Sequence, residues 1–112
     1  MVMVSKIVFQ DEGIIDVTRF DATPENPEIG YMCGGTIYAF SDGRICIHDG
    51  KKELEEVHIN DVCHYNANIN SHDPDHQTEI QLMTQTKSIR IAFADLEAKY
   101  RLVNALDCIT SG

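Results

Sequence analysis

The chain of 112 residues has no tryptophan, only three prolines and no long apolar run. A helix that crosses a bilayer needs about 20 consecutive apolar residues, so a membrane-spanning segment is not expected. The first residues, Met1 to Lys6, lack a basic head followed by an apolar stretch, so a signal peptide is not expected either. The expected compartment is the cytoplasm, with the nucleus as the alternative.

Basic residues are scarce as well. Nine Lys and Arg stand against 18 Asp and Glu, which gives a formal net charge of −9, and residues 20–43 contain no cation. Nucleic-acid binding needs clustered cations that displace counterions from phosphate, so no nucleic-acid partner is expected. Lys51 and Lys52 are adjacent but are followed by Glu53, Glu55 and Glu56. We expect these glutamates to form a solvated edge that suits a basic partner.

None of the four cysteines forms a C-x-x-C pair, and we expect all of them to be reduced. The residues with metal-ligand character are Cys63, His64, His72 and His76. Neighbouring residues of a strand point to opposite faces, so Cys63 and His64 cannot easily share one zinc ion, and no metal or other cofactor is expected. No nucleophile, base and orienting group converge in the pattern, so no catalytic residue and no enzymatic activity are expected.

Alternating apolar residues predict a mostly β chain with one domain over residues 1–112. A turn is expected at residues 11–13 between two strands, or else one long strand with a bulge at Gly13. A bulge or break is also expected at Gly34 and Gly35. The predicted strands are residues 4–10, 13–20, 29–40, 44–48, 56–59, 62–68, 79–84 and 87–93.

The chain ends in a predicted amphipathic helix over residues 95–109. Asp95 is a suitable N-cap because its carboxylate can accept from amides of the first turn. Asp95 with Lys99, and Glu97 with Arg101, have the spacing of ion pairs along a helix. Many strands followed by a single helix predict an antiparallel β-sandwich or partial barrel that the helix caps.

This order of elements resembles the pleckstrin-homology (PH) superfold. The resemblance covers about two thirds of the chain and is carried by TIYAFSDGRICIH (36–48), VHINDV (57–62) and SIRIAF (88–93) followed by ADLEAKYRLVNAL (94–106). Many PH domains have a tryptophan in the closing helix, where this chain has Leu102. Members that bind phosphoinositides carry clustered Lys and Arg on the first two strands, where this chain offers only Lys6 and Arg19 among acidic residues. The resemblance therefore implies the fold and argues against the family's lipid ligand.

The function that these observations predict is a non-catalytic protein-interaction domain of the scaffold or adaptor type, with a basic or apolar peptide as its partner. A phosphoinositide-binding domain and a small zinc protein are the alternatives. The PH resemblance offers two docking places, the strand edge beside the closing helix and an acidic open end. The predicted peptide-binding residues are Val62, His64, Asn66, Lys99, Tyr100 and Val103, and the predicted acidic rim is Asp21, Glu25, Glu28 and Asp42.

Overall fold

A computed structural model describes residues 5–20, 23–25, 30–66 and 78–111. These residues form one seven-stranded antiparallel sheet and one C-terminal helix, with a short 3₁₀ helix, η1, between the fourth and fifth strands. The elements are β1 (Ile7–Arg19), β2 (Gly30–Phe40), β3 (Arg44–His48), β4 (Glu53–His58), η1 (Ile59–Asp61), β5 (His64–Asn66), β6 (Glu79–Met83), β7 (Lys87–Phe93) and α1 (Leu96–Ser111).

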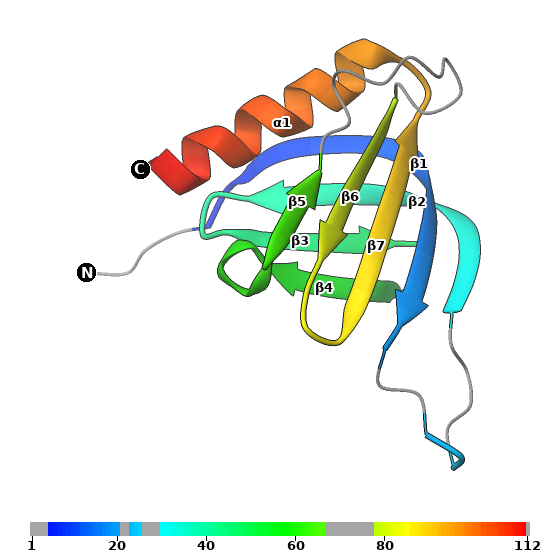
Figure 1. The fold of residues 1–112 in the computed structure, drawn as a ribbon. Helices are drawn as coiled ribbons and strands as arrows, with labels where there is room; N and C mark the ends of the chain where they lie inside the picture. The colour runs from blue at the N-terminus through cyan, green and yellow to red at the C-terminus, as the bar shows by residue number, and fades with distance from the viewer. Residues whose placement is uncertain (1–4, 21–22, 26–29, 67–77, 112) are drawn as a thin grey trace.

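The strands follow the order β4-β3-β2-β1-β7-β6-β5, and the sheet curls into a half-barrel. Strands β5 to β7 cross over β2 to β4, and α1 lies across one end of the curl (Figure 1). The predicted fold class, an antiparallel partial barrel capped by one helix, is confirmed. Among the described residues, no helix has both the length and the apolar character that crossing a bilayer requires.

β1 is one long strand, so the turn predicted at residues 11–13 is wrong. It pairs with β2 from Ile7 to Thr18 and with β7 from Gly13 onwards, and its register shift lies between Ile7 and Phe9 rather than at Gly13. A Cβ atom on Gly13 would lie 2.9 Å from the carbonyl oxygen of Ala92. The missing side chain therefore lets β7 approach β1 at the point where the curl begins.

Gly35 lies opposite Gly13, and a Cβ there would lie 2.8 Å from the carbonyl oxygen of His48. The register between β1 and β2 runs without a shift through Gly34 and Gly35, so the bulge or break predicted there is wrong. The two facing glycines allow close strand approach while the ladder of hydrogen bonds continues.

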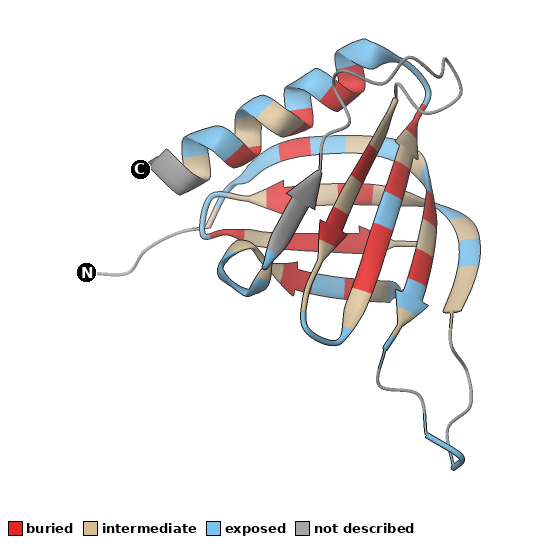
Figure 2. Cartoon of the chain, viewed as in Figure 1, coloured by how far each residue is buried: buried red, intermediate tan, exposed pale blue. Residues whose placement is uncertain are grey.

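The core fills the concave side of the sheet beneath α1 (Figure 2). Leu102, at the position where many PH domains have tryptophan, is completely buried, and Phe9 meets the edge of Phe93 with ring centroids 5.7 Å apart. The core residues are Phe9, Ile15, Val17, Ile37, Ala39, Ile45, Ile47, Val57, Ile80, Leu82, Ile89, Ile91, Phe93, Ala98, Leu102 and Leu106.

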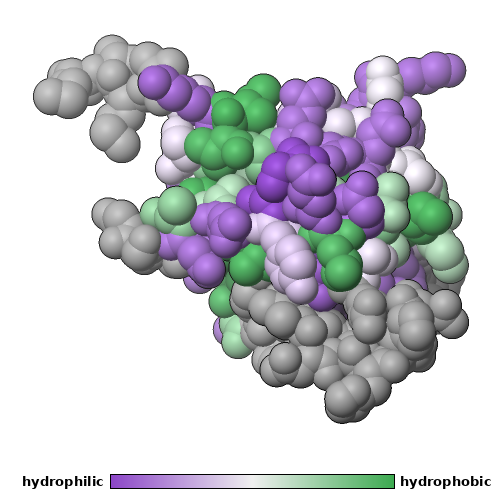
Figure 3. All heavy atoms as spheres, turned by 90° about the horizontal axis from the view of Figure 1, so that it is seen from above, coloured by the Kyte–Doolittle hydropathy of each residue, from purple (hydrophilic) through white to green (hydrophobic). Residues whose placement is uncertain are grey.

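The helix begins as the sequence predicted. The Oδ1 atom of Asp95 accepts a hydrogen bond of 2.9 Å from the amide of Ala98, which is the expected N-cap. Arg101 forms an ion pair with Asp11 of β1 and lies over the ring of Phe9. This contact ties the outward side of α1 to the first strand. Viewed from the helix side, hydrophilic side chains cover much of the described surface, with small hydrophobic groups between them (Figure 3).

Candidate functional site

Glu55 of β4 is a buried carboxylate at the end of the half-barrel away from α1. It is 4% exposed, so the expectation that Glu53, Glu55 and Glu56 all form a solvated edge is wrong for this residue. Its Oε2 atom accepts hydrogen bonds from the Tyr31 hydroxyl (2.5 Å) and from Nη2 of Arg19 (2.7 Å). Its Oε1 atom accepts from Nζ of Lys87 (2.7 Å). One side chain thus connects β4 to β2, β1 and β7.

The period of the strands explains this burial. Along β4, Glu55 alternates with the buried Val57, and along β7, Lys87 alternates with the buried Ile89. Arg19 of β1 follows the same rule after Val17. Inward positions of a strand repeat every two residues, so this sequence signal was available, but a run of three glutamates within four residues suggested a solvated edge instead.

Electrostatics fixes the protonation states in this cluster. Burial alone would raise the pKa of Glu55, but hydrogen bonds from Lys87 and Tyr31 and the positive charges of Lys87 and Arg19 outweigh it and hold the pKa below its usual range. Burial, together with the hydrogen bond to Glu55, raises the pKa of Tyr31 well above its usual value. At neutral pH an ionised carboxylate therefore faces a protonated phenol and two cations.

These two cations are consequently engaged within the protein. Arg19 and Lys87 both form ion pairs with Glu55. Lys6, the other cation predicted near a lipid site, precedes Ile7, which pairs with Phe40 at the opposite end of β1. In the described part of the chain, Lys6 and Arg19 therefore do not combine into one basic site.

A groove of about 510 Å³ lies between edge strand β4 and the turn from β6 to β7. We call it the seam groove. Lys87 reaches across it, and its Nζ lies 3.4 Å from the backbone carbonyl oxygen of Glu56. The residues that line the seam groove are Glu56, Val57, His58, Asn60, Asp61, Val62, Cys63, Thr84, Gln85, Thr86 and Lys87.

One wall of the seam groove is fixed by His58 at the end of β4. Nδ1 of His58 accepts from the amide of Asn60 (3.1 Å), so in the neutral ring Nε2 carries the proton and donates to the carbonyl oxygen of Asp42 (3.0 Å). The ring also lies against Gly43, whose φ of 98° favours glycine. These contacts hold η1 against the turn between β2 and β3.

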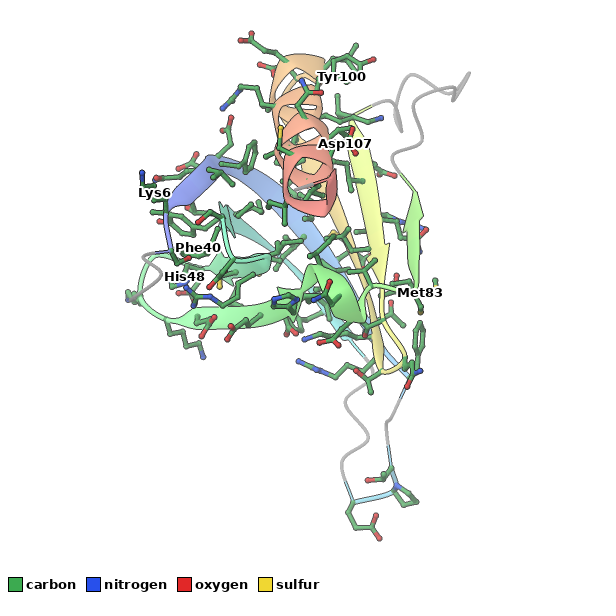
Figure 4. All side chains as sticks on the ribbon, turned by 90° about the vertical axis from the view of Figure 1, so that its left-hand side faces the viewer. Lys6, Phe40, His48, Met83, Tyr100 and Asp107 are labelled. Atoms are coloured by element: carbon green, nitrogen blue, oxygen red, sulfur yellow. The ribbon has the colours of Figure 1, made fainter. Side chains whose placement is uncertain are left out.

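The structure divides the predicted peptide-binding residues between different surfaces. Val62 lines the seam groove, and β5, with His64 and Asn66, forms the edge strand next to β6. The side chains of those two residues lie outside the described residues. Tyr100 of α1 is 42% exposed (Figure 4) and Val103 is half-buried.

Lys99 is completely buried, contrary to the expectation that it faces an open surface. Burial lowers its pKa, and the charge of Glu79 partly offsets this effect. A side chain without exposed surface offers a docking peptide no contact until something around it moves. The helical positions of the predicted site that do offer surface are therefore Tyr100 and Val103.

Two residues of the predicted acidic rim, Asp21 and Glu28, lie outside the described residues, and Glu25 is exposed. Asp42 lies in the turn after Phe40, at the end of the β1–β2 pair opposite to Thr18 and Gly30. The rim as a whole stays a prediction. The backbone amide and side chain of Arg44 lower the pKa of Asp42 through hydrogen bonds of 3.1 and 2.9 Å.

Of the four candidate metal ligands, the structure describes the side chain of Cys63 alone. Cys63 is exposed and its thiol donates to the carbonyl oxygen of Met83, while His72 and His76 lie outside the described residues. Elsewhere, the ligand atoms of Cys46, Glu53 and Glu56 lie within 4.8 Å of one another. Burial and the hydrogen bond to Glu53 raise the pKa of Cys46 to about 11. A thiol that keeps its proton is a poor nucleophile.

The outer face of β2 and β3 carries a row of aromatic rings. Tyr38 lies between Phe40 and His48, with ring centroids 6.5 and 5.2 Å away, and the guanidinium of Arg44 lies 4.5 Å from the Phe40 ring. Figure 4 shows Phe40 and His48 together on one side of the molecule, with Met83 on the other side. The rings pack on each other and on Arg44, so this row stabilises the outer face.

No family profile and no curated protein matches this chain. Solved structures do share its fold. A Ran-binding domain from the nuclear complex component Nup2 of Ashbya gossypii superposes with a TM-score of 0.60 and 13% identity, over 96% of both chains. A structure of Vav1 inhibited by an allosteric inhibitor superposes with a TM-score of 0.61 and 9% identity. That match covers 95% of this chain and 18% of the Vav1 chain.

Together with the element order, these similarities define the class of the domain. The chain has a divergent PH-like fold, as the three sequence segments predicted. At identities of 9% and 13% the likeness extends to the fold alone.

Proposed function

We propose that this chain is a non-catalytic intracellular protein-interaction domain, of the scaffold or adaptor type, that binds an extended segment of a partner protein at a sheet edge. The observation that carries the proposal is the open sheet. In the described part of the chain, β4 pairs only with β3 and β5 pairs only with β6. An unpaired strand edge presents backbone donors and acceptors to which an extended peptide can add as a further strand.

The charge arrangement supports a protein partner over a phosphoinositide headgroup. Recognition of phosphate relies on Lys and Arg donors that are free to approach it. Here Arg19 and Lys87 form ion pairs with Glu55, and Lys6 lies at the other end of β1. With a net charge of −9, the domain suits a basic or apolar peptide rather than nucleic acid or an anionic membrane.

The chemistry of the described side chains supports a binding role over catalysis. The buried thiol of Cys46 keeps its proton, and the cluster around Glu55 is saturated by hydrogen bonds within the protein. Neither group is poised to transfer a proton or attack a substrate.

Selection of displayed peptides against the purified domain tests this function. We expect enrichment of extended sequences with basic and apolar residues, and association rates that fall as salt rises. Sedimentation with phosphoinositide-containing liposomes at physiological salt should show no binding. Saturable liposome binding that is lost in Arg19→Glu would contradict the proposal, as would a selection that enriches no peptide.

A further inference from the structure

We propose that the seam groove beside β4 is the docking site, and that its ligand is an extended basic segment of a partner protein that pairs with the free edge of β4. This inference rests on the proposed function and narrows it to one of the two free edges. β5 remains the edge that sequence reasoning favoured, so the two sites make different experimental predictions.

The backbone of β4 is suitably oriented for strand addition. The amide of Ile59, just past the strand, donates to the carbonyl oxygen of Gly43 and so faces β3. The carbonyl oxygen of Glu56, three residues earlier, faces the opposite way, because Nζ of Lys87 reaches it across the seam groove. Strand residues alternate their hydrogen-bonding direction, so Glu56 and His58 both present backbone groups to the groove.

The walls of the groove suit an extended chain rather than a helix. One wall is β4 and η1, and the other is the turn at Thr84 to Lys87. The half-buried Val62 supplies apolar surface. A volume of about 510 Å³ between a strand edge and a turn gives room for a few residues of one strand.

The charge of the groove selects a basic ligand. Glu56 and Asp61 belong to its lining and are exposed, and Glu53 is exposed at the start of the same strand. Nη1 of Arg44, which is outside the lining, lies 4.0 Å from Oε1 of Glu56. The cation among the described lining residues, Lys87, shares the carboxylate of Glu55 with Arg19. Two carboxylates therefore stand against one ammonium group in the lining, which leaves an excess of negative charge.

The same charge argues against a second copy of this chain as the occupant. If two β4 edges paired with each other, their exposed Glu53 and Glu56 side chains would come together without cations from the strand itself. Like charges facing each other across a strand pair are destabilising. A partner strand that alternates lysine or arginine with apolar residues instead places cations against Glu56 and Asp61.

The test uses the purified domain and a fluorescent peptide that alternates lysine with valine, followed by anisotropy. The matched peptides carry glutamate in place of lysine, or N-methylated amides that prevent strand pairing. The double variant Glu56→Lys with Asp61→Lys should bind the lysine peptide at least about tenfold more weakly, because each reversed charge turns attraction into repulsion. Glu97→Lys, an exposed charge reversal on α1, should leave binding unchanged.

Amide chemical shifts locate the site independently of affinity. Binding of the lysine peptide should shift resonances of residues 56–63 and 84–87, and should slow hydrogen exchange at Glu56 or His58. Both matched peptides should fail to bind. Circular dichroism of the variants establishes that each is folded before its affinity is compared.

Four outcomes would overturn the inference. A peptide that binds the double variant as tightly as the parent, with shifts at Tyr100, Val103 and β5, would move the site to the other edge and leave the proposed function standing. If the lysine peptide does not bind while peptides from the selection bind elsewhere on the domain, the proposed docking site is wrong and the proposed function still stands. If neither binds, both proposals are wrong. Self-association that buries β4, seen by sedimentation velocity, would replace the peptide with a second copy.

Discussion

At the end of the half-barrel away from α1, strands β1, β2 and β7 each carry a polar side chain that donates a hydrogen bond to the carboxylate of Glu55. The three donors come from different strands, and the carboxylate on β4 accepts from all of them. An ionised acceptor that is buried without such partners would be very costly. The cluster therefore both depends on the curl of the sheet and stabilises it, because among the described strands β4 pairs with β3 alone.

Glu55→Gln should lower the free energy of unfolding by about 2 kcal/mol, because it leaves two cations beside a neutral amide. The loss should be smaller than for a fully buried pair, since the Arg19 side chain is 35% exposed. Urea denaturation measures the change. Glu53→Gln, at an exposed position of the same strand, is the control and should change stability by less than about 0.5 kcal/mol.

The depressed pKa of Glu55 predicts a pH dependence. In acid the unfolded chain binds this proton more readily than the folded one, because an unfolded glutamate has a pKa of about 4.3. The contribution to stability should be complete above about pH 5 and fall as the pH drops through the folded pKa. Urea denaturation at a series of pH values should show a shallower acid slope for Glu55→Gln. An unchanged slope would contradict the role of the cluster.

Cys46 should resist alkylation. Its pKa of about 11 leaves little thiolate at pH 8, and only 3% of the residue is exposed. Under native conditions iodoacetamide should modify Cys46 at least about 100-fold more slowly than the exposed Cys63. Mass spectrometry of peptides over time measures both rates. Equal rates in the folded protein, with normal rates for both in urea, would show that the thiol is open to solvent.

At the scale of elements, the sequence predicted the strand and helix ends that depend on neighbouring residues. The strands Arg44–His48 and Lys87–Phe93 begin and end where the alternation predicts, and α1 starts after the Asp95 cap. For β1 the sequence left a turn and one long strand as alternatives, and the long strand is confirmed, without the bulge at Gly13. The pattern could not decide between them because the role of Gly13 depends on β7, which is distant in sequence. The burial of Lys99 depends on packing too.

The candidate site was predictable only in part. The PH resemblance offered the strand edge at residues 62–68, and β5 lies at an edge of the sheet that the described residues form. The seam groove could not be predicted from the sequence, because it forms between β4 and the turn at Thr84 to Lys87, which the curled sheet brings together. The strand predicted at residues 56–59 begins at Glu53 and gives way to η1 at Ile59. The acidic edge was predicted, and it holds for the exposed Glu53 and Glu56.

Leu106→Ala should destabilise the domain by about 2 to 5 kcal/mol, because it removes a buried side chain from the contact between α1 and the sheet. Asn104→Ala, at an exposed position of the same helix, is the control and should change stability by less than about 0.5 kcal/mol. Thermal and urea unfolding followed by circular dichroism measure both. A loss below about 1 kcal/mol for Leu106→Ala would mean that α1 is not part of the cooperative core.

At the scale of the whole molecule, the net charge of −9 affects how strongly the domain attracts or repels charged partners. A surface of one predominant sign repels polyanions at distances up to the Debye length, about 8 Å at physiological salt. Within the described residues, the best-placed pair of cations, Arg19 and Lys87, is engaged by Glu55. On the proposed function, we therefore expect the domain to associate more readily with basic surfaces than with acidic ones.

Duplex DNA and single-stranded RNA should not bind this domain measurably at physiological salt, because counterion release requires several free cations. Electrophoretic mobility shift and fluorescence anisotropy are suitable measurements. Glu55→Gln is an informative variant, since it frees two cations without adding one. Retention of nucleic acid by the parent, weakening with added salt, would contradict the charge argument.

The position of β1 between β2 and β7 also determines when this domain can fold during its synthesis. β1 leaves the ribosome first, but residues Gly13 to Arg19 find their second neighbour only when β7, the last strand, has been made. Until then Ile15 and Val17 lack the strands and the helix that cover them. Such distant pairing is slow to form and leaves apolar surface open. Nascent chains that end before β7 should therefore depend on chaperones, whereas the completed chain should not.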